Sequence, residues 1–489
     1  MPGSSRIFAV VGFRNRKQIG VGNVSWRQIF KRKQGSFGIL GGVTMQMDSR
    51  TNAHRAGISA FLLGTLLFLL IPLRGFSGLI HESSDFAIVY SSSKCLIDSC
   101  NPYDSADTHR EYIKSEGDMS AGTSLIAFRP YQALYPPSTL FWIVPFASLP
   151  WKPALALWLT MSAILFAVAA FLVSDLFQQR VFATPFLLLG IFISGSGSIL
   201  AQPSSFAISL SVIGVWCLLR NRFPNLGILC FALSVALKPQ VGGLVVVYFL
   251  LVGGQVRRRS VAILVAAALL CIPGFLWVSK IPAAAHWYQD LSVNIATSTS
   301  PGGLNDPGPT NWWGAADMTS LQSLVAVFVN TPRIYNPIAW GVFGCLLLIW
   351  AHVTLRAKPS YRKDILGVAT IACLALLPVY HRTYDLRLLI LVFPAIALLF
   401  AEEGIARMGA LINSLLLIVC SHPHTIRETL KLHQDPRSPI WNLMLLCCPM
   451  VALLSSIFFL VYYARTLNPM KESAAQELGA ETVCLRSRS

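Results

Sequence analysis

The chain has 489 residues, of which 54% are hydrophobic and only 12% are charged. Soluble globular proteins carry about 25% charged residues, so this composition excludes an ordinary soluble fold. The apolar runs are continuous rather than alternating, which favours membrane-spanning helices over a membrane barrel. The net charge of +17 fits the basic loops of a membrane protein, and no folded basic domain suggests a nucleic-acid partner.

The N-terminal segment, residues 1–55, is rich in Gly and Ser and has ten Lys or Arg against one acid, Asp48. It has neither a long apolar core nor the small-residue cleavage site of a signal peptide. Two interpretations stay open. The segment is a disordered cytoplasmic tail that binds anionic lipid, or translation starts later, at Met45 or Met47.

A transmembrane domain is expected over residues 56–463, followed by a cytoplasmic tail over 464–489. It should hold about 10–13 helices, several of them shorter than the roughly 20 residues of a perpendicular span. Segment 138–150 is short and bounded by prolines, which indicates a re-entrant or interfacial helix, and 224–252 could form one kinked unit. The predicted spans cover residues 56–73, 153–176, 182–200, 204–219, 224–237, 240–252, 261–278, 337–355, 364–380, 387–400, 409–421 and 440–463.

Charge asymmetry predicts the orientation of these spans. With the N-terminus in the cytoplasm, every short basic loop falls inside, as the positive-inside rule requires. The two long loops, 74–136 and 280–336, then fall outside, with eight acids against five bases and three acids against two bases. The cytoplasmic basic residues would be Arg180, Arg220, Arg222, Arg257–Arg259, Arg356, Lys358, Arg362, Lys363, Arg407 and Arg465.

The first outer loop has an acid near the membrane surface, because Asp85 follows the first predicted span by about twelve residues. A carboxylate there could take a proton from a sugar hydroxyl if its surroundings tune its pKa. An ordinary solvated loop acid is the alternative. The same loop contains Cys95 and Cys100, which we expect to form a disulfide in an oxidising compartment.

Seven short motifs follow one another between residues 58 and 400. Each is weak alone, but their order and their predicted topological placement are specific together. They are Asp85-Phe86 with Tyr90, Asn101-Pro102-Tyr103, Tyr135-Pro136-Pro137, Ala201-Gln202-Pro203-Ser204, Leu237-Lys238-Pro239-Gln240, Ser320-Leu321-Gln322-Ser323-Leu324 and Leu377-Pro378-Val379-Tyr380-His381.

This series resembles glycosyltransferase family 87, a group of GT-C-type membrane enzymes that includes polyprenyl-phosphate-mannose-dependent mannosyltransferases. The sequence departs from the family pattern after Gln202, where Pro-Ser replaces x-Asn, and before His381, where a Ser-Trp pair is missing. The resemblance implies that Asp85 is the catalytic base. It also places Tyr103 and Gln202 among the substrate-binding residues.

Three cations could face a lipid-linked phosphate. Lys238 lies between two short apolar runs, and a cation within a membrane is usually functional, although a lysine can also snorkel to the interface. His381 and Arg387 belong to a polar turn with Asp385, and both can contact phosphate oxygens. Interface anchoring with an Arg–Asp surface pair is the alternative for that turn.

The expected protein is therefore an all-α, GT-C-like membrane transferase that moves a hexose, by resemblance mannose, from a polyprenyl-phosphate donor to a glycan or glycolipid acceptor. Transfer would occur at the outer face of a bacterial inner (plasma) membrane, with inversion. No cofactor and no metal are expected, since no metal-binding motif is present. A secondary transporter or lipid flippase is the alternative, and an inactive protein that binds lipid-linked sugar is a third.

Overall fold

Helices form the regular structure of the described chain, and the one β contact among its residues is an isolated bridge between Met318 and Arg382. All described residues belong to one unit, residues 53–489. The tail 1–55, most of the tail 464–489 and the predicted spans 56–73 and 182–200 lie outside them. The computed structural model describes residues 84–116, 133–177, 201–309, 311, 318–421 and 439–467.

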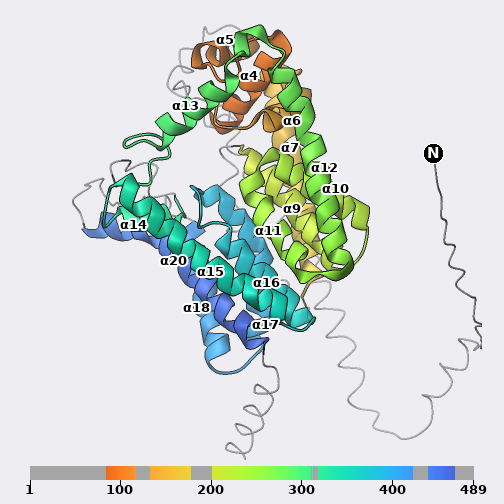
Figure 1. The fold of residues 1–489 in the computed structure, drawn as a ribbon, viewed down its shortest axis with the longest axis vertical. Helices are drawn as coiled ribbons and strands as arrows, with labels where there is room; N and C mark the ends of the chain where they lie inside the picture. The colour runs from red at the N-terminus through yellow and green to blue at the C-terminus, as the bar shows by residue number, and fades with distance from the viewer. Residues whose placement is uncertain are drawn as a thin grey trace, which may run out of the picture. The chain divides into compact units, whose positions relative to one another are not determined.

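Five helices of the described chain are long and apolar enough to cross a membrane, and several shorter apolar helices accompany them (Figure 1). The prediction of an all-α polytopic membrane protein is confirmed. The long helices are α7 (Trp151–Ser174), α12 (Gly254–Val278), α15 (Pro332–Arg356), the continuous segment of η4 (Thr383–Val392) and α17 (Phe393–Phe400), and α20 (Pro439–Arg465). The shorter helices are α6 (Pro137–Ala147), α9 (Pro203–Leu219), α10 (Pro224–Leu237), α11 (Pro239–Val252), α16 (Tyr361–Leu374) and α18 (Ile405–Ser421).

The long helices differ in how much apolar surface they expose. On α12, Val265, Leu269 and Leu276 are each more than half exposed, and Leu348 on α15 is 72% exposed. Such a surface would be unstable in water but matches the hydrocarbon of a bilayer. By contrast, η4 and α17 are almost wholly buried, so they form the centre of the helix bundle rather than its lipid-facing rim.

Prolines set where the chain is helical. Seven described helices carry proline at one of their first two positions, where its missing N–H costs nothing. Pro239 separates α10 from α11 at Lys238, so 224–252 is two helices. Pro378 lies beyond the end of α16, and the expected span 364–380 therefore stops at Leu374; residues 375–382 are not helical.

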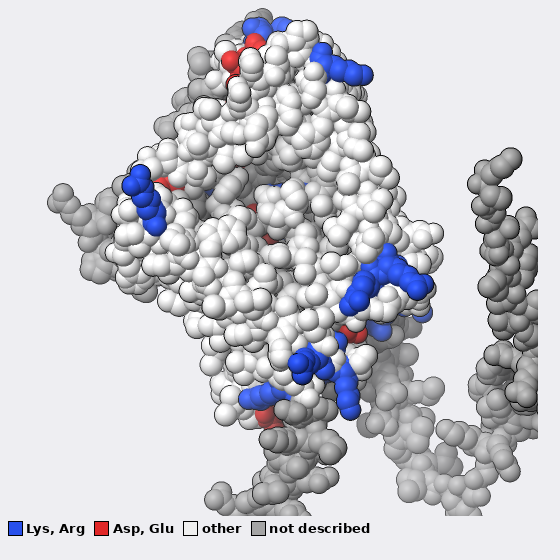
Figure 2. Space-filling model, viewed as in Figure 1, with Lys and Arg blue, Asp and Glu red and all other residues white. Residues whose placement is uncertain are grey.

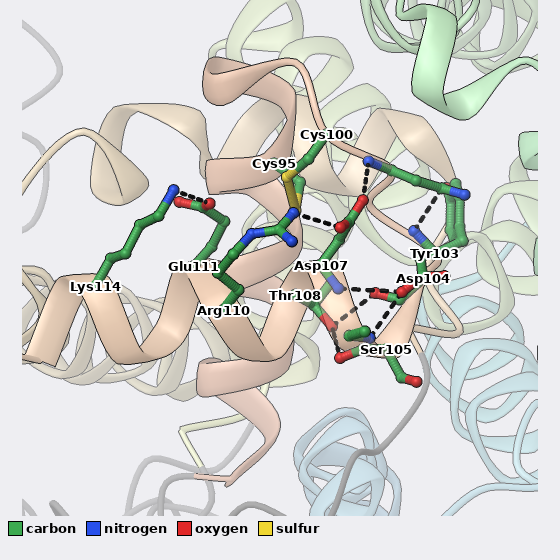
Figure 3. A network of polar contacts seen from close by, with 12 residues as sticks. Cys95, Cys100, Tyr103, Asp104, Ser105, Asp107, Thr108, Arg110, Glu111 and Lys114 are labelled. Carbon is green, nitrogen blue, oxygen red and sulfur yellow. Dashed lines mark hydrogen bonds and ion pairs between the residues drawn. A yellow bond between two sulfur atoms is a disulfide. The ribbon is translucent and has the colours of Figure 1, made fainter. Parts of the chain in front are cut away.

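A cap of small helices, formed by α4 (Ser84–Asp98), α5 (Ser105–Glu116), η2 (Pro282–Ala284) and α13 (Trp287–Thr299), lies at the top of Figure 1. Asn101 joins two of its parts by donating from Nδ2 to Oδ2 of Asp290, over 2.9 Å. Figure 3 shows the corner between α4 and α5, where a disulfide joins Cys95 to Cys100, with Cα atoms 4.6 Å apart.

Two apolar cores support these layers. The larger core packs α9, α11, α16 and α20 together, and the smaller aromatic core joins α4, α6 and α7. Basic side chains gather at the end of the molecule away from the cap, while fewer of them, accompanied by acids, surround the cap (Figure 2). The basic helix ends carry Arg220, Arg222, Arg257–Arg259, Arg356, Arg362, Arg407 and Arg465.

The close packing of α9 on α10 gives a stability prediction. A Cβ atom on Gly214 would collide with the ring of Phe231, and overpacking of this kind costs about 1–3 kcal/mol. We expect Gly214→Val to lower the free energy of unfolding by that amount in detergent titration. Gly341→Val on α15, where a Cβ atom meets nothing within 4 Å, is the matched control; equal losses in both variants would contradict the packing argument.

Candidate functional site

A cavity of about 190 Å³ lies where the two apolar cores meet, with Ile88 of the aromatic core on one wall and Leu237 of the larger core on another. Figure 2 shows a recess in the visible face with charged side chains inside it. The volume is below the roughly 300–1,000 Å³ of sites for drug-sized ligands, so the cavity would hold only a smaller group. Its polar lining is Asp85, Tyr135, Gln202, Lys238, Gln240, Asn305, Tyr380, Arg382 and Tyr384.

One wall is a hydrogen-bonded chain of three side chains. The hydroxyl of Tyr135 donates to Oε1 of Gln202 over 2.8 Å, and Nε2 of Gln202 donates to Oδ2 of Asp85. These residues are far apart in sequence, and their side chains fix one another's orientation. Within the described chain, Oδ1 of Asp85 accepts no hydrogen bond, so this oxygen remains able to receive a proton from a ligand.

Aromatic stacking holds that wall in place. The ring of Trp158 on α7 stacks between Phe86 of α4 and Phe206 of α9, with centroid distances of 5.2 and 4.9 Å. Nε1 of Trp158 also donates to the carbonyl of Ala201 over 2.8 Å. Since Phe86 adjoins Asp85 and Ala201 adjoins Gln202, the indole fixes both backbones that carry the hydrogen-bonded pair.

Two opposing effects act on the Asp85 carboxyl. Its partial burial raises its pKa above the ordinary value, because removal from water disfavours the charged form. The cation of Arg382, the hydrogen bond from Gln202 and the cation of Lys238 work in the opposite direction, while the charge of Asp385 adds to the rise. Burial is the largest effect, so the pKa of Asp85 is raised above the ordinary value of an aspartate.

A second part of the lining contains Lys238, which belongs to a buried ion pair. Nζ of Lys238 lies 3.0 Å from Oδ1 of Asp385 and also donates to Oγ of Ser204. Oδ2 of Asp385 lies 2.8 Å from Nδ1 of His381, whose Nε2 is buried without a hydrogen-bond partner in the described chain. Both charges of the pair are nearly removed from solvent, with 7% and 2% of the side chains exposed.

Sequence reasoning missed Asp385, which pairs with a lysine that lines the cavity. The turn from His381 to Arg387 suggests an aspartate paired with arginine at the surface, whereas Asp385 is buried and pairs with Lys238, 147 positions earlier. The one signal that could have found it is the buried lysine itself. A cation between apolar helices requires a counter-charge, and Asp385 lies two residues before the predicted span 387–400.

Arg382 was also missed as a site residue. It lines the cavity in the non-helical stretch before η4, where the β bridge to Met318 holds its backbone. Its guanidinium donates to the carbonyl of Leu304 over 2.7 Å and to Oδ1 of Asn305 over 3.1 Å. Because Leu304 and Asn305 also line the cavity, Arg382 links the second long loop to the site.

Of the residues predicted from the sequence, Asp85, Gln202 and Lys238 line the cavity. His381 reaches it through Asp385. Arg387 lies behind the site, where it donates to Oγ of Ser205 and its guanidinium carbon is 5.7 Å from the centre of the Phe166 ring.

Tyr103 does not line the cavity either. Its hydroxyl donates to the backbone carbonyl of Tyr135 over 3.0 Å, and its own carbonyl accepts from Nδ2 of Asn294 on α13. Tyr103 thus supports the wall from outside, since Tyr135 is the residue that reaches the cavity. The corner that carries it is fixed by the side chains of Asp104 and Asp107 (Figure 3).

Chemically, the cavity has a carboxylate with a free oxygen in one wall, and a lysine and an arginine elsewhere in its lining. The carboxylate can accept a proton, and the cations can stabilise an anion. Together with the helices, this arrangement defines a polytopic membrane protein with a cavity lined by a carboxylate and two cations.

The sequence profile of glycosyltransferase family 87 matches residues 133–380, which is more than half of the chain. The chain belongs to this family and is a membrane glycosyltransferase. No curated protein and no solved structure matches it. The matched segment includes Tyr135, Gln202 and Lys238, whereas Asp85 and Asp385 lie outside it.

The buried pair gives a prediction that does not depend on activity. Asp385→Asn leaves the Lys238 charge uncompensated, and loss of one partner of a buried pair costs about 3–5 kcal/mol. We expect the double variant Asp385→Asn/Lys238→Met to be more stable than Asp385→Asn alone in detergent unfolding titrations. Losses that simply add would show that the two side chains do not interact.

Proposed function

We propose that this glycosyltransferase moves a hexose, most simply mannose, from a polyprenyl-phosphate donor to a hydroxyl group of a glycan or glycolipid acceptor. The observation that carries the proposal is the cavity that Asp85, whose Oδ1 accepts no hydrogen bond within the described chain, shares with Lys238 and Arg382. A sugar ring in this cavity would have a base on its acceptor side and cations on its phosphate side. No cofactor takes part in the proposed reaction.

In the proposed reaction, Oδ1 of Asp85 takes the proton of the acceptor hydroxyl. The acceptor oxygen forms a bond to the anomeric carbon, and the bond from that carbon to the phosphate oxygen breaks, with its electron pair passing to the phosphate. Attack from the side opposite the phosphate inverts the anomeric configuration. The products are the glycosylated acceptor, the polyprenyl phosphate and a protonated Asp85.

The phosphate gains one negative charge in this step, because a diester becomes a monoester. Lys238 and Arg382 line the cavity and would stabilise that charge as it develops. Nε2 of His381 is a buried atom without a partner in the described chain and could donate to a phosphate oxygen. Arg387 donates to Ser205 and does not line the cavity. It would therefore act on the phosphate only through its positive charge at a distance.

The distribution of charge supports transfer at the outer face. The helix ends rich in arginine lie away from the cap, and basic residues favour the cytoplasm. The cap and the cavity beside it would then face the exterior, and the N-terminus would be cytoplasmic. A polyprenyl-phosphate donor used there fits a bacterial inner membrane, whose outer side supplies no nucleotide sugars.

One prediction tests the proposed role of Asp85 as the base. Asp85→Asn keeps an acceptor for the Gln202 hydrogen bond but cannot take a proton at neutral pH, and general-base contributions are about 100- to 10,000-fold. We expect turnover from polyprenyl-phosphate mannose to fall within that range, with donor affinity nearly unchanged, when purified protein is assayed in detergent.

Asp98→Asn is the matched control, because Asp98 is an exposed acid on the same helix. It should retain near-normal turnover. Near-normal transfer by the Asp85→Asn enzyme would refute the role of the base. A wild-type protein that moves the lipid-linked sugar across vesicles without transferring it would instead identify a transporter.

A further prediction concerns the pH dependence of turnover. Asp85 acts as a base only when ionised, so kcat/KM falls as the pH drops through its pKa. The Arg382 cation lowers that pKa, and Arg382→Gln should therefore move the acid limb of the pH profile to higher pH. Arg110→Gln, which changes a cation of the cap, should leave the limb in place; a shift of the Arg382→Gln limb to lower pH would exclude Asp85 as the titrating group.

A further inference from the structure

The break between α10 and α11 leaves backbone carbonyls without helical partners. Pro239 has no N–H, and the backbone of Lys238 is extended, with φ −153° and ψ 87°. The amide of Val241 turns to the carbonyl of Lys238, over 3.1 Å, instead of to that of Leu237. Unpaired carbonyls are costly in an apolar interior, so the break needs hydrogen-bond donors from another element.

Helix α6 supplies them. Oγ1 of Thr139 donates to the carbonyl of Leu237 over 2.6 Å, and Oγ of Ser138 donates to the carbonyl of Ala236 over 2.8 Å. Both side chains are buried. Two consecutive hydroxyl groups thus cap the last two residues of α10, directly before the lysine that reaches the cavity.

The position of α6 is fixed from two further sides. A Cβ atom on Gly274 of α12 would collide with the backbone at Pro137, so α12 packs against the first turn of α6 without a side chain between them. Oγ of Ser93 on α4 donates to the carbonyl of Leu140 over 2.9 Å. Since α4 also carries Asp85, one short helix contacts both the element of the base and the backbone of the cation.

We propose that Thr139 and Ser138 are positioning residues, which set where the Lys238 ammonium lies relative to Asp85 by capping the broken helix. Neither hydroxyl lines the cavity, so neither touches the substrate in this proposal. The inference rests on the proposed function for its effect on donor binding. The capping of the break between α10 and α11 by α6 does not depend on the proposed function.

The test uses Thr139→Val, which keeps the shape of the side chain but removes the donor. We expect its affinity for a short-chain polyprenyl phosphate to fall about tenfold, as loss of one buried hydrogen bond allows. Thr139→Ser should restore near-normal affinity. In the Lys238→Met background, Thr139→Val should cause little further loss, because residues that act through one another are not additive.

Thr370→Val is the matched control, because Thr370 is buried and its hydroxyl bonds only within its own helix, to Leu366. Amide hydrogen exchange of the peptide over residues 234–241 gives a readout that needs no ligand. It should be faster in Thr139→Val than in wild type, Thr139→Ser or Thr370→Val. If Thr139→Val does not fold, Ser138→Ala removes the neighbouring cap and should show the same two effects.

Unchanged exchange together with unchanged affinity in a folded Thr139→Val protein would overturn the inference, as would losses that add to those of Lys238→Met. A wild-type protein that does not bind polyprenyl phosphate would instead overturn the proposed donor. The exchange measurement still decides the role of α6 in that case.

Discussion

The site depends on the compensation of a single charge, the Lys238 ammonium between two short apolar helices. An uncompensated cation there would cost several kcal/mol, and Asp385 and Ser204 remove that cost. This need for a counter-charge also determines the course of the chain around Asp385. The 3-10 segment must bring Asp385 inward, and the chain before it must leave helix α16 at Leu374 so that Tyr380 and Arg382 reach the cavity.

The base is positioned by a different kind of interaction. Asp85 belongs to the cap, and the stack of Phe86, Trp158 and Phe206 joins the cap to the bundle. Stacked rings bury large apolar areas and tolerate little displacement. The carboxylate is therefore held by packing and the lysine by charge and capping, so a substitution can displace one of them without the other.

What the sequence could predict depends on how far apart along the chain the interacting residues lie. Continuous apolar runs and prolines are local signals, and they placed α10 and α11 within a residue of their observed bounds. Gln202 and Lys238 were identified because their short motifs are local as well. Asp385 and Arg382 were missed because their partners lie far along the chain, and Arg387 was assigned to the phosphate because its burial behind Ser205 leaves no trace in the sequence.

The proposed reaction also explains why Asp385 has two partners. As the acceptor proton reaches Asp85, one negative charge disappears from the base wall and one appears on the departing phosphate. Lys238 can turn toward that phosphate only if Asp385 keeps a partner, and His381, 2.8 Å away, is that partner. A carboxylate shared between lysine and histidine thus keeps a hydrogen-bond partner when the lysine turns toward the product anion, and a buried carboxylate without such a partner would be costly.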